Sequence, residues 1–138
     1  KPEDGELFEQ FAREYKDYAN ITFWHKNLIG VEWQKALLGV DAIMMPYAAE
    51  RYRYHWGAML FTAIGFYKPV LQSPELNPEV LQQFNVGKAI DLSSVEAFSR
   101  QLEEFIEDLV KNTAVYQQGL DEANHVYGQD KLIQGILR

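Results

Sequence analysis

One short stretch of the chain gathers most of the side chains that could bind a small charged ligand. Two arginines, one histidine, one glutamate and four aromatic residues lie between Tyr47 and Gly57. Arginine binds phosphate through two parallel hydrogen bonds, and aromatic rings offer faces on which a base or a sugar can stack. The candidate residues of this stretch are Glu50, Arg51, Arg53, Tyr54, His55 and Trp56.

The residues that follow this stretch predict a helix whose first turn is open to an anion. The predicted helix covers residues 56–66 and begins with the small residues Gly57 and Ala58. A helix start without bulky side chains exposes backbone N–H groups, which bind phosphate well. His25 and Asn27 follow an earlier predicted strand, so we expect them to face the same cleft.

Each of these residues also has an ordinary structural interpretation. Aromatic clusters are common in cores and interfaces, and a single histidine is more often structural than catalytic. The concentration of charged and aromatic side chains at the end of one predicted strand favours a site.

The composition excludes several classes of function. The chain has 138 residues with 13 basic and 20 acidic side chains, a net charge of −7, and no cysteine. A broad nucleic-acid surface needs a basic face, and cysteine-based zinc sites or nucleophiles are impossible. The chain contains no glycine-rich dinucleotide motif, no P-loop and no HExxH pattern, so we expect neither a cofactor nor a metal. No apolar run approaches the roughly 18 residues of a membrane span.

Short apolar runs alternate with helical periodicity along the chain. Strands are predicted at 21–24, 42–45, 69–72 and 87–92, and helices at 5–18, 31–38, 56–66, 78–84, 93–109 and from 113 onward, with Gly119 as a possible break. Asn77 and Ser93 are the predicted N-caps of two helices. This alternation indicates an α/β fold with a parallel sheet, in which ligands bind beyond the carboxyl ends of the strands.

The order of these segments resembles the donor-binding half of the GT-B glycosyltransferases. The resemblance lies in Val40 to Tyr47, Glu50, residues 57–66 and Lys68 to Leu71, and continues through Pro78-Glu79, residues 87–91 and residues 95–109. It implies a Rossmann-like parallel sheet with flanking helices, followed by C-terminal helices.

The resemblance implies transfer of a sugar from a nucleotide-sugar donor to an acceptor, without a metal. The start of the helix at Gly57 and Ala58 would hold the donor diphosphate. The two glutamates of many retaining members fall on Tyr54 and Thr62 here, so a hydroxyl would stand in for the second carboxylate, and Glu50 is out of register. The implied donor-binding residues are His25, Asn27, Arg51, Arg53, Tyr54, Trp56, Gly57, Ala58, Thr62 and Glu79, and the catalytic candidates are Glu50 and His55.

The resemblance also implies a longer protein. Domains of this family begin with a strand, a helix and a second strand that have no counterpart here, and the basic pair of their first loop is missing with them. We expect residues 1–112 to form the donor-binding domain without that first unit, and residues 113–138 to form a helical extension. The acceptor, a glycan or a lipid-linked sugar, would bind through a separate N-terminal domain of a cytoplasmic protein, peripheral at the membrane in its full length.

Two other functions stay open. The missing second glutamate fits a non-catalytic domain of the same fold that binds a partner protein or a glycan. The acidic C-terminal helices fit a helical interaction module, which would contain almost no strand.

Overall fold

Three short parallel strands organise the larger part of the chain. The computed structural model describes residues 2–47 and 57–128. Close contacts divide the chain into two units, Lys1–Gln34 and Lys35–Arg138. The helix α2 (Gly30–Leu38) spans this division and confirms the predicted helix at 31–38.

The N-terminal unit contains α1 (Pro2–Glu14), the irregular segment that follows it and the first residues of α2. The ring of Phe8 lies edge to face with Phe23 at 5.8 Å and against His25 at 4.6 Å. The predicted strand at 21–24 is wrong, because the structure assigns no strand to these residues. β-branched and aromatic residues favour a strand only where a neighbouring strand pairs with it, and here Phe23 packs on a helix instead.

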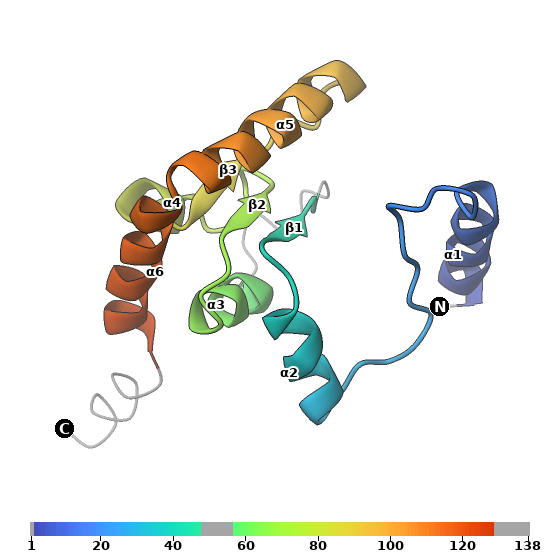
Figure 1. The fold of residues 1–138 in the computed structure, drawn as a ribbon, viewed down its shortest axis with the longest axis horizontal. Coiled ribbons are helices and arrows are strands. Elements are labelled where there is room, and N and C mark those ends of the chain that lie inside the picture. The colour runs from blue at the N-terminus through green and yellow to red at the C-terminus, as the bar shows by residue number, and fades with distance from the viewer. Residues whose placement is uncertain (1, 48–56, 129–138) are drawn as a thin grey trace. The chain divides into compact units, whose positions relative to one another are not determined.

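The sheet contains β1 (Ile43–Met45), β2 (Val70–Gln72) and β3 (Gly87–Ala89), all parallel, with β2 in the middle (Figure 1). The register pairs Met44 with Leu71 and Leu71 with Lys88. These strands confirm the predictions at 42–45 and 69–72, and the third is shorter than the predicted 87–92. Continuous apolar runs are typical of parallel strands, which are covered on both faces.

Helices cover the sheet from both sides. The connections between the strands contain α3 (Ala58–Gly65) and α4 (Pro78–Gln83), whose buried residues share a core with Met45 and Val70. On the opposite face, Phe105 of α5 (Val95–Lys111) packs with Leu71 and Ile90. The chain therefore has a mixed α/β fold, and the sheet argues against a module built of helices alone.

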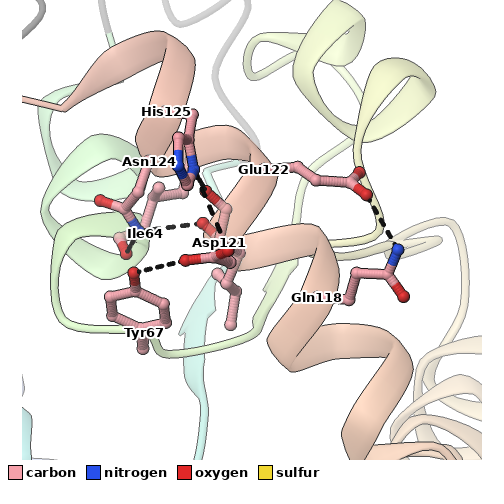
Figure 2. Close-up of polar contacts among 8 residues, drawn as sticks. Ile64, Tyr67, Gln118, Asp121, Glu122, Asn124 and His125 are labelled. Atoms are coloured by element: carbon pink, nitrogen blue, oxygen red, sulfur yellow. Dashed lines mark hydrogen bonds and ion pairs between the residues drawn. The ribbon is translucent and has the colours of Figure 1, made fainter.

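The last described helix, α6 (Thr113–Tyr127), belongs to the same core. Its Leu120 and Ala123 are buried with residues of α3. The Asn124 amide donates to the carbonyl oxygen of Ile64 at 2.7 Å, and the Tyr67 hydroxyl donates to Asp121 at 3.0 Å (Figure 2). Residues 113–127, the described part of the expected helical extension, therefore pack into the larger unit. The division of the chain lies after Gln34 instead. Residues 129–138 lie outside the described part.

The N-cap of α5 is Ser94, one residue after the predicted Ser93. The Ser94 hydroxyl, and not that of Ser93, accepts a hydrogen bond from the backbone N–H of Ala97 at 3.1 Å. The backbone N–H of Ser93 instead donates to Asp91 at 2.8 Å. A serine at either position satisfies the sequence rule for an N-cap, and the turn at Asp91 decides between them.

A polar cluster joins α5 to α6 and predicts an acid-dependent loss of stability. The Tyr116 hydroxyl and the Asn112 amide both donate to the Asp108 carboxylate, and these bonds lower the pKa of Asp108 below its ordinary value. A carboxylate whose pKa is lowered on folding stabilises the fold above its unfolded pKa, and this contribution is lost as the pH falls through the folded pKa. Asp108→Asn should therefore lower stability by about 1 kcal/mol at neutral pH.

Chemical unfolding at a series of pH values tests this contribution. As the pH falls below the ordinary aspartate pKa of about 3.9, the wild-type chain should lose more stability than Asp108→Asn. The matched control is Glu104→Gln on the same helix, whose exposed pair with Arg100 at 3.9 Å contributes little. Equal acid sensitivity of the wild type and Asp108→Asn would contradict the assignment.

Candidate functional site

The loops at the carboxyl ends of β1 and β2 are joined by a single asparagine. Asn77 has left-handed backbone geometry with φ 42°, which asparagine adopts more readily than most residues. Its side-chain oxygen accepts the backbone N–H of Gly57 at 3.0 Å, and its amide donates to the Glu79 carboxylate at 3.1 Å. Asn77 therefore holds the start of α3 beside the start of α4.

The space around Gly57 is filled by the side chains of Asn77 and Leu76. A Cβ atom at this position would lie 2.4 Å from the Asn77 side-chain oxygen and 3.1 Å from Cδ1 of Leu76. The close approach of the two loops therefore favours glycine here, since any larger residue would have to displace the Asn77 and Leu76 side chains.

The structure brings together Gly57, Ala58, Thr62 and Glu79 from the predicted site. The Gly57 N–H already donates to the Asn77 side-chain oxygen at 3.0 Å, so it could reach a diphosphate only if this bond opened. That the helix start at Gly57 and Ala58 holds the donor diphosphate stays a prediction. The Thr62 hydroxyl donates to the carbonyl oxygen of Ala58 at 2.9 Å, so only its oxygen lone pairs stay available as acceptors. Ala58 and Glu79 are exposed.

For the remaining predicted site residues, the structure gives no placement relative to this arrangement. His25 and Asn27 belong to the N-terminal unit. The reason for expecting them in the cleft was a strand at 21–24, which does not form. Glu50, Arg51, Arg53, Tyr54, His55 and Trp56 lie outside the described residues.

Sequence reasoning missed two features at the end of β2. Asn77 was predicted as an N-cap, although its side chain makes no cap bond and reaches the other loop. Gln72 is buried, and its amide donates to the Leu76 carbonyl oxygen, whereas its side-chain oxygen has no partner among the described residues. An Asn-Pro pair predicts a helix start whether the asparagine side chain caps its own helix or reaches another loop. The local sequence therefore does not reveal the contact between Asn77 and Gly57.

Hollows and charged groups elsewhere in the described ranges show no second catalytic arrangement. A hollow of about 320 Å³ lies between α4 and the strands β2 and β3, lined by Gln72 and Ser73 among others. A larger hollow of about 690 Å³ lies at the opposite, amino end of β1 and β2. Among the described residues, no group of three or more His, Asp or Glu could hold a metal, and no helix is long and apolar enough to cross a membrane.

Comparison with known proteins finds no family model that matches the chain, no similar curated protein and no similar solved structure. The contacts at the carboxyl ends of the strands place the starts of two helices side by side at one edge of a parallel sheet.

Proposed function

We propose that this chain is a nucleotide-sugar-binding domain of a glycosyltransferase, with a Rossmann-like fold. The observation that supports this proposal is the Asn77 bridge between Gly57 and Glu79. It sets the starts of α3 and α4 together at the carboxyl ends of two parallel strands, which is where open α/β sheets bind their ligands.

In this proposal, different residues bind the diphosphate and the sugar or ribose of the donor. Arg51 and Arg53 bind the diphosphate, and the exposed start of α3 at Ala58 adds the favourable end of the helix dipole. The Glu79 carboxylate has acceptor capacity beyond its bond with Asn77, so it accepts a hydroxyl of the sugar or the ribose. Charge neutralisation by arginine and backbone amides replaces a metal ion in this scheme, and the acceptor binds outside this domain.

A non-catalytic domain of the same fold is the second candidate. The observation that favours it is the commitment of the Thr62 hydroxyl proton to the Ala58 carbonyl. A threonine in this state can only accept hydrogen bonds, through two lone pairs, where a carboxylate would offer about four. Such a domain would bind a partner protein or a glycan and transfer nothing.

Titration calorimetry with nucleotide sugars separates the two candidates. The probes are UDP-glucose, GDP-mannose and their free nucleoside diphosphates. We expect at least one to bind, and Arg53→Ala to weaken it about tenfold through loss of a charged phosphate contact. Lys111→Ala is the control, because Lys111 pairs with Glu107 on the outer side of α5 and should change nothing. Absence of binding to every probe by the folded chain would reject the donor-binding function.

A further inference from the structure

Gln72 places a buried polar side chain at the carboxyl end of the central strand. Its exposed fraction is 1%, and the register pairs it with Met45 on one side and Ala89 on the other. Its backbone oxygen accepts from the Ile90 N–H at 2.8 Å. The side chain of Gln72 therefore starts from a backbone that both neighbouring strands hold in place.

The side-chain amide of Gln72 is paired at its nitrogen. Nε2 donates to the Leu76 backbone oxygen, whereas Oε1 has no partner among the described residues. This pairing fixes the orientation of the amide, because a carbonyl oxygen accepts from Nε2 but has no hydrogen to give to Oε1. An unpaired buried oxygen is unfavourable, and methionine, an apolar side chain of similar length, would avoid it. Packing alone therefore does not account for a glutamine here, whereas the bond to Leu76 does.

The bond from Gln72 acts on the peptide unit that precedes Asn77. The Leu76 oxygen and the Asn77 nitrogen belong to one planar unit, so a hydrogen bond to that oxygen limits rotation about φ of Asn77. This φ is 42°, and a residue other than glycine keeps such a left-handed value only where its surroundings hold it. The Gln72 amide is one of the groups that hold it.

Asn77 carries this restraint to the starts of both helices. Its side-chain oxygen accepts the Gly57 N–H at 3.0 Å, and its amide donates to the Glu79 carboxylate at 3.1 Å. A rotation of the Leu76–Asn77 peptide unit would carry the Asn77 side chain away from these partners. The bridge between the two loops therefore depends on a side chain that lies beneath it in the sheet.

We propose that Gln72 is a positioning residue of the nucleotide-sugar site. Its amide holds the Leu76–Asn77 peptide unit and thereby keeps Asn77 in the conformation that joins Gly57 to Glu79. Gln72 itself touches no part of the nucleotide sugar. Its role in binding rests on the proposed function, whereas its effect on the loop does not.

Amide hydrogen exchange, measured by NMR on the full chain, tests the effect on the loop. Gln72→Met keeps the length of the side chain and removes its donor, so the Gly57 N–H should exchange about tenfold faster than in the wild type. The Val70 N–H of β2, which donates to the Val86 oxygen at 3.0 Å, should keep its rate. The thermal midpoint should shift by less than about 5 °C, because the variant loses one unpaired buried oxygen, Oε1, and leaves that of Leu76 unpaired instead.

Three further variants support the comparison. Asn77→Gly removes the acceptor of the Gly57 N–H and sets the upper limit of its exchange rate. Gln72→Asn has an amide one methylene short of the Leu76 oxygen, so it should also speed exchange at Gly57. The matched control is Gln83→Met, the same change at an exposed position of α4, which should leave the rate unchanged. Unchanged exchange at Gly57 in both Gln72 variants would overturn the proposal.

Equal acceleration at Gly57 and Val70 would also overturn it, because it would mean that Gln72 only stabilises the core. Calorimetry with UDP-glucose and GDP-mannose tests the consequence for binding, and we expect Gln72→Met to weaken a nucleotide sugar that binds the wild type severalfold. Equal affinity of the two chains would remove Gln72 from the site. Absence of binding by the wild type would reject the proposed function and the role of Gln72 in it, while the exchange rates decide separately whether Gln72 holds the loop.

Discussion

Gly119→Ala should lower the free energy of unfolding by about 1–3 kcal/mol, although alanine is the better helix former. Gly119 lies inside α6 and is buried. A Cβ atom there would lie 2.3 Å from the backbone oxygen of Asn85 and 2.6 Å from its carbonyl carbon. Backbone atoms cannot rotate away as the end of a side chain can, so α6 has to shift as a whole. This shift would disturb the neighbouring contacts of Leu120 with the core.

The matched control is Gly65→Ala in α3. Gly65 is also helical, is exposed, and has no atom within 4 Å of the position of a Cβ. Alanine there should leave stability unchanged or raise it by about 0.5–1 kcal/mol, since it restricts the unfolded chain. Urea unfolding followed by circular dichroism compares the two variants. A Gly119→Ala variant as stable as Gly65→Ala would mean that α6 does not approach Asn85 this closely.

The strands could be predicted from the sequence where burial imposes a local pattern. Strands of a parallel sheet covered by helices are mostly apolar, so the runs at 42–45 and 69–72 identify β1 and β2, with Gln72 as the buried polar exception. Residues 21–24 are β-branched and aromatic, which also favours a strand, but they form none, because pairing is a long-range property that composition does not encode. Gly119 was also misjudged from local sequence alone. It was expected to break a helix, but it lies inside α6, against the backbone of Asn85, which is distant in the sequence.

The candidate site was predictable in its position and less so in its contacts. The rule for parallel sheets selects the loops after β1 and β2, and Gly57 and Glu79 lie there. The bond that joins these loops connects residues 20 positions apart and depends on the left-handed backbone of Asn77. A local pattern identifies Asn77 as a cap, and only the folded chain shows that its oxygen reaches the other loop.

Gly57→Ala should reduce both stability and donor affinity, and a second substitution can separate the two effects. The added Cβ would lie 2.4 Å from the Asn77 oxygen, so the bond between the loops should break, at a cost of about 1–3 kcal/mol in the free energy of unfolding. If the donor diphosphate lies against the start of α3, affinity for the nucleotide sugar should fall about tenfold as well.

The double variant Gly57→Ala with Asn77→Gly tests whether Gly57 is needed for donor binding or only for the packing of the two loops. Glycine at position 77 keeps the left-handed backbone with φ 42° and removes the side chain that the new Cβ would meet. Unfolding experiments should therefore show recovery of part of the lost stability, while calorimetry should show donor affinity as weak as in the single variant. Asn77→Gly alone is the control for loss of the bridge. Recovery of full affinity in the double variant would mean that Gly57 serves only the packing of the two loops, and the diphosphate would then have to bind elsewhere along the carboxyl edge of the sheet.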